Sequence, residues 1–317
     1  MASAFVFPGQ GSQAVGMGKA LAEAFPAAAA VFTEVDDALG QKLSHLMFEG
    51  PEADLTLTAN AQPALMAVSI AVLRVLEAEA GLDLAAEAKF VAGHSLGEYS
   101  ALAAAGAFTL ADTARLLRLR GDAMQKAVPV GEGAMAAFLG LDLAGGREVC
   151  AEAAAATGLV CQIANDNGGG QVVASGAKAA VEKAMEIAKA RGVKRAIPLP
   201  VSAPFHCALM QPAADAMAQA LSAVRINSPK VPLVANVLAA PITDPEDIRK
   251  RLVEQVTGTV RWAESVAWMA GQGVRSFYEL GSGKVLSGLV KRIAPEAAGT
   301  PVGAPGDVEA FKSRAKG

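Results

Sequence analysis

Histidine and cysteine are both scarce in this sequence, with three residues of each among 317. The cysteines, Cys150, Cys161 and Cys207, are odd in number and far apart, so they form neither a disulfide framework nor a CxxC pair. We therefore expect reduced thiols in a cytoplasmic compartment, and we predict no metal site.

Signals of nucleic-acid binding and of membrane insertion are also lacking. The formal net charge is −3, and no basic block with interleaved aromatic residues occurs. The first cation is Lys19, so we expect no signal peptide. The longest apolar stretch on a predicted helix, 65–73, ends at Arg74 and is too short to span a bilayer. These absences predict a soluble cytoplasmic protein without nucleic-acid or membrane partners.

Apolar residues are plentiful, at 52% of the chain against 19% charged residues, and the length of 317 residues favours two structural units. A strand over 4–7 leads through a glycine-rich loop into a helix over about 18–32. A strand over 89–92 leads through the turn 93–97 into an alanine-rich helix. Strand, tight turn and helix in succession predict an α/β sheet with its site at the strand ends. Further helices are expected over 34–48, 61–80, 110–126, 211–224, 246–257 and 262–272, further strands over 232–237 and 276–280, and a frayed end after about 295.

The segment 131–199 follows a different pattern. Its apolar periodicities predict the order strand, helix, strand, strand, helix, strand, with a glycine-rich turn at 167–170 between the two central strands. This βαββαβ order is typical of a ferredoxin-like fold. We interpret the segment as a small domain inserted into the larger one.

The motif Gly93-His94-Ser95-Leu96-Gly97 matches GxSxG and stands between a predicted strand and a predicted helix. Glycines two residues before and after the serine relieve the clashes of such a sharp turn. The turn would aim the Ser95 hydroxyl at a helix N-terminus, whose free N–H groups favour developing negative charge. Ser95 is the predicted nucleophile, and a purely structural turn is the alternative.

A serine hydroxyl needs a base, and with three histidines the candidates can be compared one by one. His94 adjoins Ser95 in a turn where successive side chains diverge. His45 lies in a predicted helix and is expected at its surface. His206 stands in a loop directly after the strand that closes the insert, where it can reach the site. We predict His206 as the base, with a structural histidine as the alternative.

No acid completes a hydrolase triad. None of the aspartates between Ser95 and His206 lies in a strand-end loop and also fits the usual chain order of a hydrolase triad. A backbone carbonyl is therefore the other candidate for orienting the base. These aspartates are Asp112, Asp122, Asp142 and Asp166.

The glycine-rich loop around Gln10 carries neither a Walker motif nor GxGxxG, and Val285 replaces the hydroxyl that a phosphate loop would need after Lys284. Such a loop can instead supply a backbone N–H beside the nucleophile. The N–H groups of Gln10 and Leu96 would then form an oxyanion hole.

Arg120 falls on the apolar side of the predicted helix 110–126. Four other charged residues of this helix share the opposite face, Arg115, Arg118, Asp122 and Lys126. A charge that points inward needs an anionic partner. The alternatives are a buried salt bridge, a snorkelling stem, or a bidentate clamp on a substrate carboxylate.

Several motifs occur in the order of one known family: Phe7-Pro8-Gly9-Gln10-Gly11-Ser12-Gln13, Gln62-Pro63-Ala64-Leu65, Gly93-His94-Ser95-Leu96-Gly97-Glu98-Tyr99, Arg120-Gly121, Phe205-His206 and Gly281-Ser282-Gly283. Over 5–293 the chain resembles malonyl-CoA:acyl carrier protein transacylases of type II fatty acid synthesis. The resemblance implies an α/β-hydrolase-like large domain, 1–130 and 200–317, with the ferredoxin-like insert at 131–199.

The resemblance also implies a ping-pong reaction. Malonyl-CoA would acylate Ser95, and the phosphopantetheine thiol of acyl carrier protein would take the malonyl group for fatty acid biosynthesis. His206 would be the base, Arg120 the clamp on the malonyl carboxylate, and Gln10 and Leu96 the oxyanion donors. Gln255 matches the position whose backbone carbonyl orients the histidine. No cofactor is expected, because malonyl-CoA is a substrate and the partner carries the phosphopantetheine; we expect a monomer.

One departure concerns Phe205, which stands where several bacterial stand-alone relatives have serine and where malonyl-selective polyketide synthase domains often have phenylalanine. It supports malonyl selectivity. Two rival functions stay open: a serine hydrolase that releases the acyl group to water, and a catalytically silent subunit that binds the carrier protein. For docking of an acidic carrier protein, the insert offers four cations, Lys189, Arg191, Lys194 and Arg195.

Overall fold

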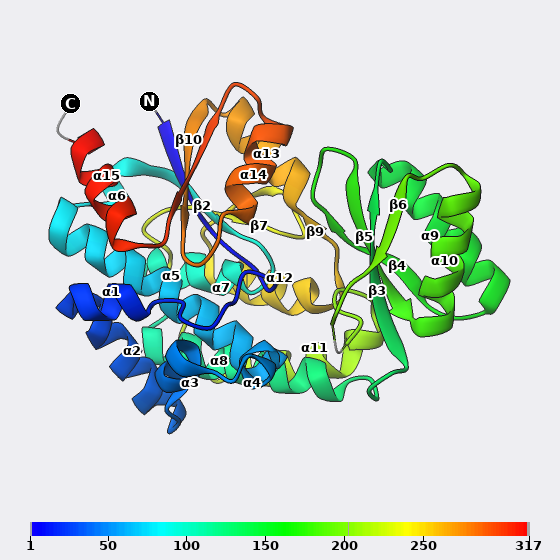
Figure 1. The fold of residues 1–317 in the computed structure, drawn as a ribbon, viewed down its shortest axis with the longest axis horizontal. Helices are drawn as coiled ribbons and strands as arrows, with labels where there is room; N and C mark the ends of the chain where they lie inside the picture. The colour runs from blue at the N-terminus through cyan, green and yellow to red at the C-terminus, as the bar shows by residue number, and fades with distance from the viewer. Residues whose placement is uncertain (1, 202, 316–317) are drawn as a thin grey trace.

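Two β-sheets lie side by side in the molecule, which the computed structural model describes over residues 2–201 and 203–315 (Figure 1). In the larger sheet the strand order is β11–β10–β1–β2–β7–β8. Neighbouring strands from β11 to β7 run parallel, and β8 turns back antiparallel to β7. The strands are β1 (Ala2–Phe7), β2 (Ala88–Gly93), β7 (Leu233–Ala235), β8 (Ala240–Ile242), β10 (Val274–Leu280) and β11 (Ala298–Val302).

Helices cover both faces of this sheet, which explains why the last four residues of β1 and of β2 carry no polar side chain and are buried. Successive side chains of a strand point to opposite faces. Phe5 and Phe7 accordingly join one buried cluster, whereas Ala4 and Val6 join another. The first cluster includes residues of α5 (Thr58–Ala80), α7 (Gly97–Ala104) and α8 (Leu110–Lys126), and the second includes residues of α13 (Trp262–Gly271) and α14 (Val285–Ile293).

Helix α5 is longer than the apolar stretch 65–73 suggested. Within the described ranges it is the one helix whose length and composition would allow it to cross a membrane. However, 89% of its apolar window is buried inside the fold, where it contacts α8 and α2. It is the central core helix of the larger part.

The helices expected over 18–32 and 34–48 are wrong in their boundaries. Pro26 lacks a backbone N–H and disfavours a helical residue before it, so Phe25 is extended, with φ −133° and ψ 118°, and the helix breaks there. Gly40, in the left-handed conformation, ends the next helix. The chain therefore forms α1 (Lys19–Ala24), α2 (Pro26–Leu39), α3 (Leu43–Glu49) and α4 (Glu52–Thr56).

The smaller sheet has the strand order β6–β3–β5–β4–β9 and lies to the right in Figure 1. The expected order of elements in 131–199 is confirmed, and two helices pack on the sheet around a core of their own. One strand comes from outside that segment, because β9 pairs in parallel with β4. The elements are β3 (Gly133–Leu139), α9 (Leu143–Thr157), β4 (Cys161–Asp166), β5 (Gln171–Ala177), α10 (Lys178–Ala190), β6 (Arg195–Pro198) and β9 (Val260–Arg261).

The expectation of a frayed end after about 295 is wrong. Strand β11 pairs in parallel with β10 at the edge of the larger sheet, and α15 (Pro305–Ala315) follows it. Val308 and Phe311 of α15 are buried, and the Phe311 ring meets Tyr278 edge-on at 5.1 Å between centroids. With Gly and Pro among its five residues, β11 lacks a strand-like sequence, and an edge position is where proline is tolerated in a sheet.

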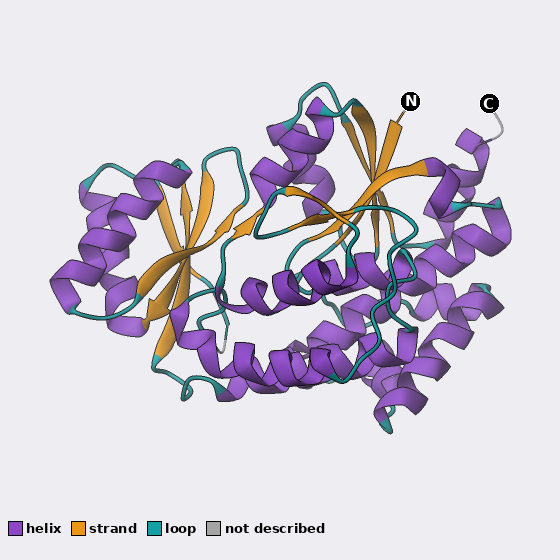
Figure 2. Ribbon diagram, turned by 180° about the vertical axis from the view of Figure 1, so that it is seen from behind, coloured by secondary structure: helices purple, strands orange, loops and turns teal. Residues whose placement is uncertain are grey.

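The helices at 211–222 and 245–257 run along the larger part and towards the smaller sheet, as the view from behind shows (Figure 2). The expected helices at 211–224 and 246–257 are confirmed as α11 (Gln211–Ser222) and α12 (Pro245–Thr257). A short α6 (Leu84–Glu87) precedes β2, and a 3₁₀ turn, Ala208–Met210, precedes α11.

Candidate active site

Ser95 stands at a sharp turn between β2 and α7, with a positive φ of 53°. A Cβ at Gly93 would lie 1.9 Å from the backbone carbonyl of Gly97, and a Cβ at Gly97 would lie 2.2 Å from the carbonyl oxygen of Phe7. Both positions therefore accept glycine alone. The turn lifts the Ser95 side chain out of the sheet beside the N-terminus of α7.

The structure brings His206 directly to the serine, with 2.7 Å between Ser95 Oγ and His206 Nε2. His206 is 4% exposed and also has a positive φ, of 58°. Its Nδ1 lies 2.9 Å from the backbone carbonyl oxygen of Gln255, in the last turn of α12. Because a carbonyl oxygen can only accept, Nδ1 carries the proton and Nε2 is left to accept from the serine.

The other two histidines lie elsewhere. His94 Nε2 is 2.9 Å from Asn167 Oδ1, in the turn between β4 and β5, and its ring lies 5.7 Å from the Trp262 ring. His45 is exposed on α3. Neither faces the Ser95 hydroxyl.

Burial sets the protonation state of His206. Desolvation lowers the pKa of His206 to about 3, and the neighbouring Arg120 charge adds to the effect. The imidazole is therefore neutral at ordinary pH and can accept a proton.

Arg120 is 1% exposed, and its guanidinium is held by neutral acceptors. Nη1 donates to Gln62 Oε1 at 2.7 Å, and Nη2 donates both to Gln255 Oε1 at 2.8 Å and to Ser95 Oγ at 3.2 Å. Nε has no partner, and no Asp or Glu within the described ranges lies at salt-bridge distance from this side chain. The buried salt bridge considered for Arg120 does not form.

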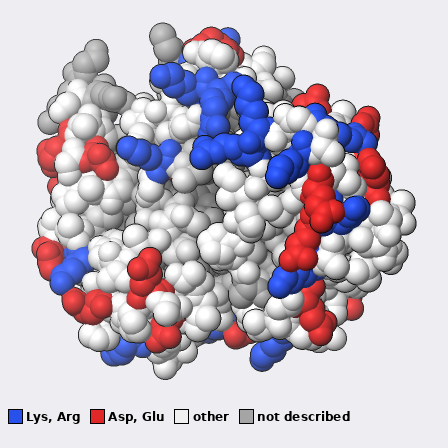
Figure 3. Space-filling view, turned by 45° about the vertical axis from the view of Figure 1, so that its right-hand side comes forward, with Lys and Arg blue, Asp and Glu red and all other residues white. Residues whose placement is uncertain are grey.

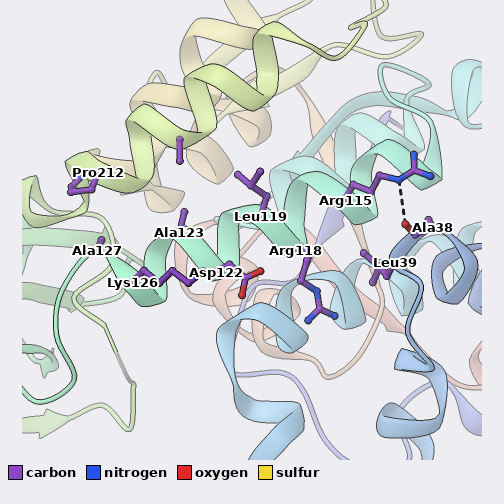
Figure 4. Close-up of a pocket in the computed structure, with 11 residues that line it drawn as sticks. Ala38, Leu39, Arg115, Arg118, Leu119, Asp122, Ala123, Lys126, Ala127 and Pro212 are labelled. Atoms are coloured by element: carbon purple, nitrogen blue, oxygen red, sulfur yellow. Dashed lines mark hydrogen bonds between the residues drawn. The ribbon is translucent and has the colours of Figure 1, made fainter.

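The opposite face of α8 lines a separate hollow of about 590 Å³, which α2 and α11 also border (Figure 4). It contains the four charged residues expected to share that face, and Arg120 is not among them. Arg115 Nε donates to the Ala38 carbonyl oxygen at 3.2 Å. The predicted division of α8 into a charged and an apolar face is confirmed.

A cavity of about 480 Å³ opens over Ser95 between the two sheets. Gln10 and Leu96, the expected oxyanion donors, both line it, and the Gln10 side chain donates to Thr58 Oγ1 at 3.2 Å. Ser95, Arg120 and Glu52 are among its polar lining residues, and apolar side chains form much of the rest of the wall. These apolar residues are Met124, Met135, Leu199, Val201 and Phe205.

Sequence reasoning missed two buried residues beneath the serine. Asn236 Oδ1 accepts from the Ser95 backbone N–H at 2.8 Å, and its Nδ2 donates to the Gly93 carbonyl oxygen at 2.7 Å, which ties the elbow to the end of β7. Glu98, 1% exposed, accepts from Gln255 Nε2 at 2.5 Å. Burial raises the pKa of Glu98 to about 7. A single carboxylate in a helix whose other residues are uncharged was the available signal.

Residues 4–299 match the acyl transferase domain family, and a serine with a paired histidine suits such chemistry. The chain is thus an acyltransferase.

Named relatives narrow the class. A malonyl CoA-acyl carrier protein transacylase from Bacillus subtilis (strain 168) is 51% identical over 290 residues, 92% of this chain and 90% of its own length. The acyl-carrier-protein-S-malonyltransferase structure from Bartonella henselae is 59% identical with a TM-score of 0.97, covering 100% of both chains. A malonyl-transacylase in complex with a type II PKS acyl-carrier protein is 43% identical with a TM-score of 0.95, covering 99% of this chain and 100% of its own. The chain belongs to the family of malonyl CoA-acyl carrier protein transacylases.

Proposed function

We propose that this protein transfers the malonyl group from malonyl-CoA to the phosphopantetheine thiol of acyl carrier protein through a malonyl-Ser95 intermediate, in a ping-pong reaction that supplies fatty acid biosynthesis. The observation that carries the proposal is the position of Ser95 Oγ, 2.7 Å from His206 Nε2 and 3.2 Å from Arg120 Nη2. One oxygen thus faces both a base and a cation able to bind a carboxylate.

In the first half-reaction, Ser95 Oγ bonds to the thioester carbonyl carbon of malonyl-CoA while its proton passes to His206 Nε2. The N–H groups of Gln10 and Leu96 stabilise the oxyanion. The Gln255 carbonyl holds the Nδ1 proton of the imidazolium at 2.9 Å. The carbon–sulfur bond then breaks, and the CoA thiolate leaves with the proton from His206.

The second half-reaction reverses these roles. The phosphopantetheine thiol gives its proton to His206 and attacks the ester carbonyl, and Ser95 Oγ leaves and recovers the proton. The products are free CoA and malonyl-acyl carrier protein. No cofactor or metal is needed, since both half-reactions exchange only an acyl group and a proton.

Arg120 supplies the selectivity for malonyl. Its guanidinium has no carboxylate partner in the described part of the chain, so the substrate's own carboxylate can supply the missing negative charge. An esterase for neutral acyl chains would gain nothing from such a cation, which favours a malonyl transferase over a general serine hydrolase.

Docking of an acidic carrier protein calls for positive charge near the cavity. Figure 3 shows Lys and Arg side chains gathered at the upper rim of a hollow in the surface. Lys189, Lys194 and Arg195 are exposed on the smaller sheet's layer and are therefore accessible to a partner. Arg191 contributes less, because Glu148 and Glu152 pair with it at 2.9 and 2.7 Å.

We further propose a cytoplasmic monomer built from an α/β-hydrolase-like domain, 1–130 and 200–317, and a ferredoxin-like insert, 131–199. The element order within 133–198 and the strand order β6–β3–β5–β4 support the insert. The strand–elbow–helix arrangement of β2, Ser95 and α7 supports the larger domain.

The test compares transfer with hydrolysis. Radiolabelled malonyl-CoA is mixed with the protein and holo-acyl carrier protein, and label on the carrier is measured against free malonate. The proposal predicts label on the carrier, which Ser95→Ala abolishes. Predominant release of malonate with carrier present would identify a hydrolase instead, and a wild-type protein that traps no malonyl group would identify a silent binding subunit.

A further inference from the structure

The side chain of Gln255 has a position that its expected role does not explain. The backbone carbonyl of this residue meets His206, whereas its side chain is wholly buried and reaches in another direction. Side-chain Oε1 accepts from Arg120 Nη2 at 2.8 Å, and Nε2 donates to the backbone carbonyl oxygen of Ser95 at 2.9 Å. A single residue therefore contacts the nucleophile, its base and the clamping cation.

The charges around the Gln255 amide allow only one orientation. Its Nε2 faces acceptors alone: the Ser95 carbonyl oxygen, Glu98 Oε2 at 2.5 Å and Asn236 Oδ1 at 3.4 Å. Its Oε1 faces the guanidinium of Arg120. An inverted amide would place its oxygen against the carboxylate and its NH₂ group against the cation, and both contacts are repulsive.

Glu98 is the charged member of this arrangement, yet it has no direct contact with Arg120. Its two oxygens accept from Gln255 Nε2 and, at 3.3 Å, from the Asn236 backbone N–H. The carboxylate and the guanidinium thus lie on opposite ends of one amide, which they hold between them. Glu52 also lines the cavity, but no Asp or Glu of the described residues lies at salt-bridge distance from the guanidinium.

We propose that the side chain of Gln255, oriented by Glu98, is a specificity-determining positioning element that holds the Arg120 guanidinium beside Ser95 Oγ for acyl groups bearing a carboxylate. The proposal rests on the malonyl transfer proposed above. Neither residue donates or accepts a proton in that reaction; both act through Arg120.

The role can be separated from the orientation of His206, because the histidine contacts the backbone of Gln255 and not its side chain. Gln255→Met keeps the backbone carbonyl and much of the volume but removes both polar ends of the amide. Acylation of Ser95 is followed by intact-protein mass after rapid mixing with malonyl-CoA or acetyl-CoA at pH 8, above the Glu98 pKa of about 7.

We expect Gln255→Met to lower the ratio of malonyl to acetyl loading about tenfold or more, as for the loss of a hydrogen bond to a charged group, while the lost bond from Nε2 to the Ser95 carbonyl lowers both rates alike. The pH profile of acetyl loading, which reports on His206, should not change. Glu279→Gln is the matched control for the Glu98→Gln variant described next, because Glu279 is a similarly buried carboxylate that accepts from the backbone N–H groups of Leu286 and Ser287 and does not line the cavity. It should leave the malonyl-to-acetyl ratio at the wild-type value.

Glu98→Gln tests whether Glu98 acts through Gln255. Alone it should lower the malonyl-to-acetyl ratio, but in the Gln255→Met background it should lower it no further, because its contact is already lost. Equal losses for both acyl groups, or additive effects of the two substitutions, would overturn the proposal even where Gln255→Met folds poorly, since Glu98→Gln is nearly isosteric. Failure of the wild type to take malonyl at all would instead overturn the proposed function.

Discussion

Arg120 Nη2 lies 3.2 Å from Ser95 Oγ, so the buried cation touches the same oxygen that faces the base. The contact places a fixed positive charge beside the oxygen that would attack the thioester. A carboxylate on the incoming acyl chain can then give the guanidinium the charged partner that it lacks among the described residues, while Gln62 and Gln255 keep their hydrogen bonds to it. In the proposed reaction, selectivity for malonyl and activation of Ser95 therefore depend on one small region of the cavity.

Arg120→Ala should shift the protein towards uncharged acyl groups. Removing the guanidinium deletes the only cation beside Ser95 Oγ among the hydrogen bonds of the described residues, and malonyl loading should fall on the order of 100-fold. Acetyl loading should stay within a few-fold of wild type. The measurement is the ratio of Ser95 acylation rates from the two CoA thioesters; equal losses would mean that Arg120 does not bind the acyl carboxylate.

Asn236→Ala should loosen the elbow from below. The substitution removes the acceptor of the Ser95 backbone N–H and the donor to the Gly93 carbonyl, which leaves two buried backbone groups unpaired. We expect the free energy of unfolding in urea to fall by about 1–3 kcal/mol. Acyl transfer should fall for malonyl and acetyl alike, in contrast to Arg120→Ala, and an unchanged unfolding midpoint would show that the elbow does not depend on this side chain.

Gly97→Ala should prevent the elbow from forming, because the new Cβ would lie 2.2 Å from the Phe7 carbonyl oxygen and backbone cannot move aside cheaply. The expected result is an insoluble or strongly destabilised protein, by about 3 kcal/mol or more. Gly271→Ala is the control, since a Cβ there meets no atom within 4 Å. Wild-type unfolding curves for Gly97→Ala would contradict the close approach of β1 and α7.

The rate of Ser95 acylation should not show the fall below about pH 6.5 that a histidine base with an ordinary pKa would cause. Since burial and Arg120 lower the pKa of His206 to about 3, the base is already neutral near pH 5, and kcat/KM for acetyl-CoA should not fall around pH 6.5. Acetyl-CoA is the better probe, because its acyl group carries no charge of its own. If the wild type shows a midpoint near 6.5 and the same midpoint persists in Glu98→Gln, the midpoint belongs to His206, whose pKa would then be ordinary.

Glu98 should make stability fall as the pH rises. Burial raises its pKa from 4.5 to about 7, so the folded state binds the proton more tightly than the unfolded state. Its contribution to stability is fully present below about pH 4.5 and is lost as the pH rises through about 7; Arg120 limits the loss. The free energy of unfolding of wild type minus that of Glu98→Gln, measured from pH 4 to 8, should decrease with pH. An increase would mean that Glu98 is stabilised as a carboxylate.

The sequence was sufficient to predict residues whose role depends on a local pattern. The elbow glycines follow from the GxSxG motif, and the two faces of α8 and the βαββαβ order of the smaller sheet follow from short-range apolar periodicity. Elimination among three histidines also singled out the one that the structure brings to Ser95.

Features that depend on distant partners could not be predicted in the same way. Strand β9 has two residues and exists only because β4 accepts it, and β11 has an unfavourable composition that its pairing with β10 overrides. The side chains of Asn236 and Gln255 matter because they contact Ser95, from which they are separated by 141 and 160 residues in the sequence. No local pattern carries that information.

The most direct test of the account is a two-step chase on Ser95. The protein is mixed with malonyl-CoA alone, freed of CoA, and its Ser95 peptide is examined by mass spectrometry before and after addition of holo-acyl carrier protein. The account predicts a malonyl ester on Ser95 that disappears as malonyl-acyl carrier protein forms in equal amount. An unmodified Ser95, or an ester that decays to malonate at the same rate with and without the carrier, would contradict it.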